Sequence, residues 1–166
     1  MIEQKLGPAS FDGQFYSRKR MLDNGIGFVV LDMQPQDSKG KPPILLAAGP
    51  STSLGGSEFV LRELYNLSGR RVFALSYDFD DTGGPRPLFL PDGSYQNGIR
   101  VLISHFKLDK VDIIVCPKAA TDVTKVVAEG CGRRIYFVPP KDKYNIFQNS
   151  EVIQQAIKEL EMSKVV

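Results

Sequence analysis

The sequence has few of the residues on which metal binding and nucleophilic catalysis most often depend. It contains one histidine, His105, two cysteines, Cys116 and Cys131, and no tryptophan. A single histidine excludes a metal site built from several imidazoles, and two cysteines can form neither a disulfide framework nor a zinc-ligand spacing. We therefore expect the protein to work without a cofactor.

The chain also lacks long apolar runs and a strong charge of either sign. A transmembrane helix needs about 18 consecutive apolar residues, and no stretch of the chain approaches that length. The first ten residues, MIEQKLGPAS, do not resemble a signal peptide. The 21 basic and 19 acidic residues give a net charge of only +2, which is less basic than a typical nucleic-acid binder. We expect a cytoplasmic protein that binds neither nucleic acid nor a membrane.

The composition is that of a folded protein of ordinary domain size. Of the 166 residues, 42% are hydrophobic and 24% are charged, which is typical of a globular chain. We therefore predict a single domain over residues 1–166. Residues 1–24 are mixed in character and predict an irregular N-terminal arm that has room for a short edge strand at 14–18, whereas residues 141–166 predict a connector and a C-terminal helix.

Apolar runs alternate with amphipathic segments along most of the chain. The runs at 44–48, 72–77, 111–116 and 135–138 lack polar alternation, which is typical of strands buried on both faces of a parallel sheet. A further strand is predicted at 27–33. The segments 57–68, 95–108, 119–130 and 150–162 have the apolar spacing of helices. This order predicts an α/β three-layer sandwich, in which a twisted, mostly parallel sheet of five or six strands has helices on both faces.

The loops after the parallel strands are the expected place for a binding site, because ligands of such sheets lie outside the carboxyl ends of the strands. The loop after residues 44–48 is rich in small residues and leads into a helix, whose free N–H groups can hold an anion. A plain connecting loop is the alternative. The predicted ligand-binding residues are Gly49, Ser51, Ser53, Gly55, Cys116, Lys118 and Thr121.

Two further sets of residues are weaker candidates for chemistry. Cys116 ends a predicted strand, where a following helix N-terminus would lower the pKa of its thiol, and His105 would be its only available base. An inert buried cysteine is the alternative that burial statistics favour. Asp78, Asp80 and Asp81 cluster after another strand and would offer oxygen ligands to Mg²⁺ or Ca²⁺, although such a cluster is more often a solvated turn.

Two segments carry a resemblance to a known family. KGKPPILLAAG (39–49) leads through a Gly/Pro-rich turn into a buried strand, and LDKVDIIVCPKAA (108–120) leads from a strand into a helix. They resemble the strand that ends in His-Gly, and the approach to the nucleophile elbow, of the α/β-hydrolases. The resemblance covers residues 24–140 in the layout of their elements and implies the α/β-hydrolase fold.

The residues that perform the hydrolase reaction are missing from the matching positions. The family's elbow has the pattern Gly-x-Ser-x-Gly, and Pro117 occupies the place of the nucleophile. One oxyanion-hole donor maps to Pro50, which has no N–H, and no histidine follows His105 to act as the base. Little chain follows Pro140 for the family's last two strands. The resemblance thus implies a shortened relative without a catalytic triad, or one half of an assembly that another chain completes.

A second resemblance is shorter. GGSEFVLREL (55–64), and VDIIVCPKAAT (111–121) followed by RIYFVPP (134–140), look like parts of the N-terminal half of two-domain glycosyltransferases. In that family the helix N-terminus faces a nucleotide sugar or an acceptor. The motif is short and common, so it carries less weight than the first resemblance.

Together these observations predict a non-catalytic, α/β-hydrolase-like domain, a pseudoenzyme that binds a small molecule or a protein. Two alternatives remain open: a hydrolase or transferase that uses Cys116, and a subunit or half-domain completed by another chain. An uncovered edge of the predicted sheet would also pair with a second copy, so we expect a homo-oligomer.

Overall fold

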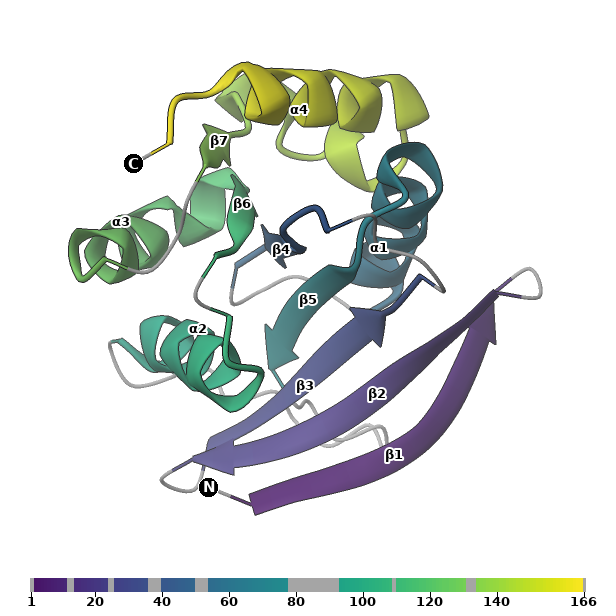
Figure 1. The fold of residues 1–166 in the computed structure, drawn as a ribbon, viewed down its shortest axis with the longest axis vertical. Helices are drawn as coiled ribbons and strands as arrows, with labels where there is room; N and C mark the ends of the chain where they lie inside the picture. Colours follow the sequence, from purple (N-terminus) through teal and green to yellow (C-terminus); the bar gives the residue numbers. More distant parts are fainter. Residues whose placement is uncertain are drawn as a thin grey trace.

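The structure, a computed structural model, describes residues 2–11, 14–23, 26–35, 40–49, 54–77, 93–108, 110–130 and 134–165. Within these residues the chain forms a seven-stranded sheet of order β1-β2-β3-β5-β4-β6-β7 (Figure 1). The strands are β1 (Ile2–Phe11), β2 (Gln14–Asp23), β3 (Ile26–Met33), β4 (Ile44–Ala47), β5 (Val72–Tyr77), β6 (Asp112–Val115) and β7 (Ile135–Phe137). The helices are α1 (Leu54–Ser68), α2 (Ser94–His105), α3 (Ala120–Ala128) and α4 (Ser150–Met162), with short 3-10 turns η1 (Pro117–Ala119), η2 (Pro140–Asp142) and η3 (Asn145–Phe147).

The sheet has an antiparallel part and a parallel part. Strands β1, β2 and β3 pair antiparallel in sequence order, and β3 also pairs antiparallel with β5. Strand β4 lies between β5 and β6 and runs parallel to both, and β7 runs parallel to β6. The predicted α/β class is confirmed, and the strand–helix–strand unit expected from β4 to β5 is present.

The prediction of an irregular arm over residues 1–24 is wrong, because β1 and β2 lie there and bring the sheet to seven strands. Both strands carry several charged residues and lack the apolar run of a strand buried on both faces. Pro8 lies where the pairing of β1 with β2 shifts its register. Proline is tolerated there because β1 is an edge strand, on which one row of N–H groups has no ladder partner.

Two apolar clusters lie on opposite faces of the sheet. One joins the sheet to α1 and α4, and it includes Val60, Leu61 and Leu64 of α1. The other joins the sheet to α2 and α3, and it includes Ile99 and Val123. The helices therefore cover both faces, which confirms the three-layer arrangement. Among the residues that the structure describes, no helix has both the length and the apolar character needed to cross a membrane.

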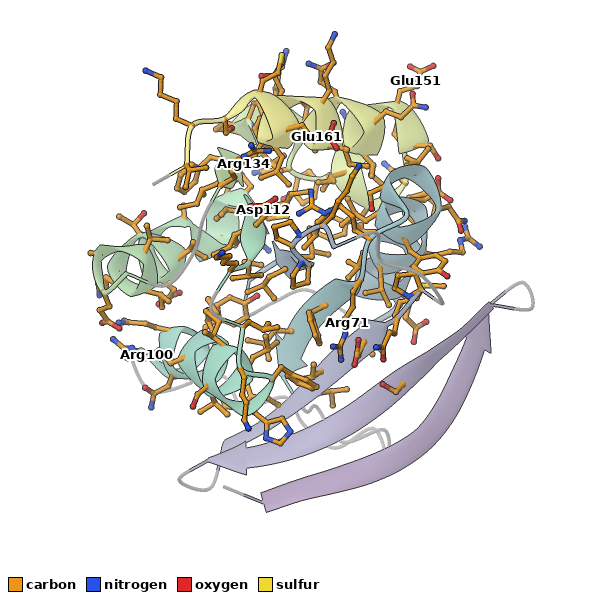
Figure 2. The ribbon with its side chains drawn as sticks, in the orientation of Figure 1. Arg71, Arg100, Asp112, Arg134, Glu151 and Glu161 are labelled. Carbon is orange, nitrogen blue, oxygen red and sulfur yellow. The ribbon has the colours of Figure 1, made fainter. Side chains whose placement is uncertain are left out.

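Ion pairs hold the amino end of β5 against its neighbours. Arg71 precedes this strand, and its Nε and Nη2 atoms donate to the two carboxylate oxygens of Asp32 on β3, at 2.9 and 2.7 Å (Figure 2). The guanidinium of Arg71 also lies over the ring of Phe73, 4.6 Å from its centroid. This planar, two-point pairing is the geometry for which an arginine side chain is best suited.

Some predicted helix ends differ from those in the structure. α1 begins at Leu54, about one turn before the predicted start at residue 57, so that Ser57 lies inside the helix and is buried. At α4 the cap is Asn149, whose side chain accepts a hydrogen bond from the Glu151 N–H at 2.9 Å. Ser150, the first residue of α4, donates to Glu63 Oε2 on α1 at 2.7 Å.

Candidate functional site

The carboxyl ends of β4 and β6 form the floor of the site. Ala47 and Val115 are paired in the parallel ladder, and each strand then leads into the loop predicted to bind ligands. The Cys116 N–H donates to the Ala47 carbonyl at 2.9 Å, and the Val138 N–H donates to the Val115 carbonyl at 2.8 Å. These two bonds continue the ladder beyond the strands and hold three strand ends at fixed positions.

Gly49 brings the loop after β4 into direct contact with η1. Its φ of +105° is one that residues with a side chain rarely adopt. A Cβ atom at this position would lie 2.7 Å from the Cβ of Lys118 and 3.2 Å from its carbonyl carbon. Only glycine permits this approach, so the structure places two of the predicted ligand-binding residues, Gly49 and Lys118, side by side.

A buried tyrosine that the sequence analysis did not identify holds this loop. The Gly49 N–H donates to the Tyr95 hydroxyl oxygen at 3.1 Å, and that hydroxyl donates to the Leu75 carbonyl at 3.4 Å. Tyr95 is in the first turn of α2 and is 2% exposed. A buried tyrosine hydroxyl needs a hydrogen-bond partner. The sequence signal that could have identified Tyr95 is therefore a tyrosine at the start of the amphipathic helix predicted from residue 95. The Gly49 N–H is therefore occupied, and the next residue, Pro50, has no N–H to offer an oxyanion.

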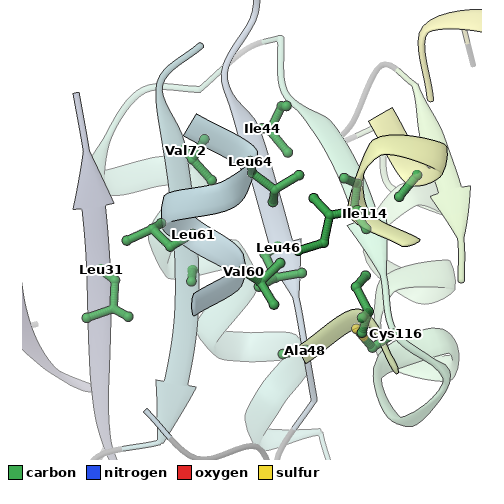
Figure 3. Packing of buried hydrophobic residues seen from close by; sticks show 14 of the residues in the cluster. Leu31, Ile44, Leu46, Ala48, Val60, Leu61, Leu64, Val72, Ile114 and Cys116 are labelled. Carbon is green, nitrogen blue, oxygen red and sulfur yellow. The ribbon is translucent and has the colours of Figure 1, made fainter. Parts of the chain in front are cut away.

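Cys116 is part of the core that joins the sheet to α1 and α4. It is 2% exposed and lies in the same cluster as Ala48 and Ile114 (Figure 3). Burial raises the pKa of its thiol to about 12, so the expected lowering of that pKa does not occur. The residue that follows is Pro117, which cannot donate an N–H to a thiolate. Burial removes the sulfur from water and disfavours the charged thiolate, so the pKa of the thiol rises.

The structure does not bring His105 to Cys116. His105 is the last residue of α2, and the next residue, Phe106, packs against Phe73 with ring centroids 4.8 Å apart. Phe73 is the second residue of β5 and so marks the amino end of the sheet. Cys116 follows the carboxyl end of the parallel strand β6. The two side chains thus lie toward opposite ends of the sheet, and no base is available to the thiol from His105.

The remaining predicted residues divide into those that the structure describes and those outside its described ranges. Lys118 and Thr121 are exposed, at η1 and at the start of α3, and Gly55 is in the first turn of α1. The hydroxyl of the buried Ser57, also in that turn, has no hydrogen-bond partner in the described part of the chain. The predicted residues Ser51, Ser53, Asp78, Asp80 and Asp81 lie outside the described ranges.

Within the described ranges, no three His, Cys, Asp or Glu side chains are grouped so as to hold a metal ion. This finding does not extend to the acidic cluster after β5, since that cluster is outside those ranges. The described site instead offers one exposed ammonium group, that of Lys118, and one exposed hydroxyl, that of Thr121. Both lie near the close contact between Gly49 and η1.

No protein-family model matches the chain, and no curated protein is similar to it in sequence. Solved structures are similar in fold. An epoxide hydrolase mutant from Aspergillus niger has 11% identity and a TM-score of 0.57, over 76% of this chain and 36% of that chain. A predicted CIB-like hydrolase from Thermoplasma acidophilum has 16% identity and a TM-score of 0.55, over 80% of this chain and 63% of that chain. A haloalkane dehalogenase from Agrobacterium tumefaciens has 14% identity and a TM-score of 0.54, over 74% of this chain and 40% of that chain.

These comparisons establish the fold of the chain. It is the α/β-hydrolase fold, as the layout of the sequence predicted. The chain spans between 36% and 63% of the length of these three structures. A shared fold does not carry an activity with it, because function resides in the site. The resemblance to a glycosyltransferase half-domain stays a prediction.

Proposed function

We propose that this chain is a non-catalytic α/β-hydrolase-fold domain, which binds a small anionic molecule over the carboxyl ends of β4 and β6. Lys118 and Thr121 are the polar groups that face solvent there, on η1 and at the start of α3. An ammonium group and a hydroxyl can together hold a carboxylate or a phosphate. The contact between Gly49 and Lys118 fixes the backbone from which the ammonium group projects.

The observation that carries the proposal is the absence of a nucleophile at the bend after β6. The thiol of Cys116 points into the core and has a pKa of about 12, and Pro117 has no reactive group. Neither residue can start an acyl transfer, which requires an exposed nucleophile beside a base. The burial of the thiol likewise argues against the alternative of a Cys116-dependent hydrolase or transferase.

An esterase assay tests the absence of catalysis. The purified chain should hydrolyse p-nitrophenyl acetate no faster than its Cys116→Ser variant, and neither should exceed heat-denatured protein at the same concentration. A fluorophosphonate probe should leave the chain unlabelled. A turnover that survives further purification and disappears in Cys116→Ser would show that the domain is an enzyme.

Native mass spectrometry tests binding. A small anion retained by the purified chain should be lost from Lys118→Ala and Thr121→Ala. It should remain on Lys125→Ala, a matched control in which an exposed lysine of α3 is removed. If all three variants retain the same molecule, or if the unaltered chain retains none, the proposed site is wrong.

We also propose that the chain associates with a second copy through β7. This strand is an edge of the sheet, and its Phe137 is a large apolar side chain that is 47% exposed. Light scattering should give a dimer mass for the unaltered chain and a monomer mass for Phe137→Lys. A monomer at every concentration of the unaltered chain would contradict this role.

A further inference from the structure

A pocket lies at the opposite end of the parallel strands from the site described above. It is formed where the chain enters β4, β6 and β7, beneath the last turn of α4, and it has a volume of about 340 Å³. Figure 2 shows three of its side chains, those of Asp112, Arg134 and Glu161, in this region. Its lining residues are Lys41, Pro42, Arg70, Asp112, Arg134 and Glu161.

The wall of this pocket contains a buried ion pair. Arg70 Nη2 lies 2.5 Å from Asp112 Oδ2, and both side chains are 3% exposed. Arg70 Nε also donates to the Pro42 carbonyl at 2.7 Å, so the guanidinium is held from two directions. The second carboxylate oxygen, Asp112 Oδ1, is buried and has no hydrogen-bond partner among the residues that the structure describes. Such an orphaned acceptor in a pocket wall points to a donor that binds there.

The pocket also has an excess of positive charge. Arg134 Nε is buried without a hydrogen-bond partner, and no ion pair within the described ranges engages Arg134, Lys41 or Glu161. Because Arg70 and Asp112 neutralise each other, the described lining of the pocket retains two cations, Arg134 and Lys41, and one carboxylate, Glu161. A guanidinium whose N–H group has no partner is suited to binding an oxyanion, because its N–H groups donate to the anion's oxygens in the plane of the guanidinium.

We propose that this pocket binds an oxyanion that also donates a hydrogen bond, of which phosphate is the simplest example. The oxygens of the anion accept from Arg134 and are attracted by Lys41, while a P–OH group donates to Asp112 Oδ1. Asp112 Oδ1 and Arg134 Nε are both buried, so binding requires these two side chains to move and open the atoms to the ligand. This site is separate from the carboxyl-end site and does not depend on the function proposed for it.

Comparison of phosphate with sulfate tests the donor. The two ions have the same shape, but near neutral pH only phosphate keeps a proton. In calorimetric titrations at low ionic strength, phosphate should bind at least about tenfold more tightly than sulfate, because Asp112 Oδ1 gains a charge-assisted hydrogen bond only from phosphate. A parallel titration with glycerol 3-phosphate separates an organic phosphate ligand from the free ion, and saturable binding of either one supports the proposal.

Matched variants test the cations. Arg134→Gln should weaken phosphate binding about tenfold or more, because it removes the charge that faces the anion. Lys158→Gln, at an exposed position of α4 outside the pocket, should leave it within about twofold, since an exposed charge is screened by solvent. If circular dichroism shows that Arg134→Gln does not fold, Lys41→Gln replaces it in this test, because that variant removes an exposed charge of the pocket.

Three results would overturn the proposal. They are the absence of saturable phosphate binding, equal affinity for phosphate and sulfate, and an equal loss of affinity in Arg134→Gln and Lys158→Gln. The last result would mean that phosphate responds only to the net charge of the chain.

Discussion

The reactivity of Cys116 provides the most direct test of the proposal that this domain is non-catalytic. The pKa of the thiol is raised by burial from 9.0 to about 12. Because alkylation requires the thiolate, and each pKa unit changes its fraction tenfold, the thiolate near neutral pH falls about a thousandfold below that of an unperturbed cysteine. Native Cys116 should therefore react with iodoacetamide about a thousand times more slowly than the same residue in the unfolded chain.

The assay uses a Cys131→Ser variant, so that Cys116 is the only thiol. Labelling is followed by intact mass spectrometry from mildly acidic to strongly alkaline pH, with and without guanidinium, and a variant that lacks both cysteines gives the background. The native rate should still be rising with pH above the ordinary thiol pKa of 9.0. A native rate within about tenfold of the unfolded rate near neutral pH would refute the reasoning, because it would require an accessible thiolate.

Three further predictions concern stability and its dependence on pH. Asp112→Asn breaks the buried pair with Arg70 and should lower the free energy of unfolding in urea by about 3–5 kcal/mol. Gly49→Ala should destabilise the chain by at least about 2 kcal/mol, since its Cβ would lie 2.7 Å from a side-chain carbon of η1. Gly40→Ala, also at positive φ but with nothing within 4 Å, should cost less, and equal losses would contradict the steric argument. Burial raises the pKa of Tyr136 above 10.0, so stability should fall as the pH rises from that value, and Tyr136→Phe should reduce the fall.

The parallel half of the sheet could be predicted from the sequence because burial on both faces leaves a simple pattern. Strand β5 and helix α4 have the bounds that their apolar spacing predicted. The antiparallel strands β1 and β2 could not be predicted in the same way. Their many charged residues and Pro8 are typical of an irregular segment, and they also suit a strand at or near a sheet edge.

The candidate site was predictable only as far as topology determines it. Parallel strands end at the same edge, so the sequence alone placed Gly49 and Lys118 at that edge. Their contact depends on how η1 packs against the loop after β4, and the hydrogen bond from Gly49 to the Tyr95 hydroxyl depends on the packing of α2 against the sheet. The pocket at the amino end was missed because its charged groups come from five separate segments, each with one charged residue.

The alternation of side chains along β6 explains why neither residue at the bend after this strand is an exposed nucleophile. Ile113 and Val115 face the cluster under α2 and α3, whereas Ile114 and Cys116 face the cluster under α1 and α4. Side chains alternate between the two faces of a strand, so Cys116, two residues after Ile114, points into the same cluster as Ile114. The next position, 117, begins the turn η1 and is a proline. The register that stabilises the sheet thus places the Cys116 thiol in the core and a residue without reactive atoms at the bend, so the lack of an exposed nucleophile at this bend follows from the packing of β6.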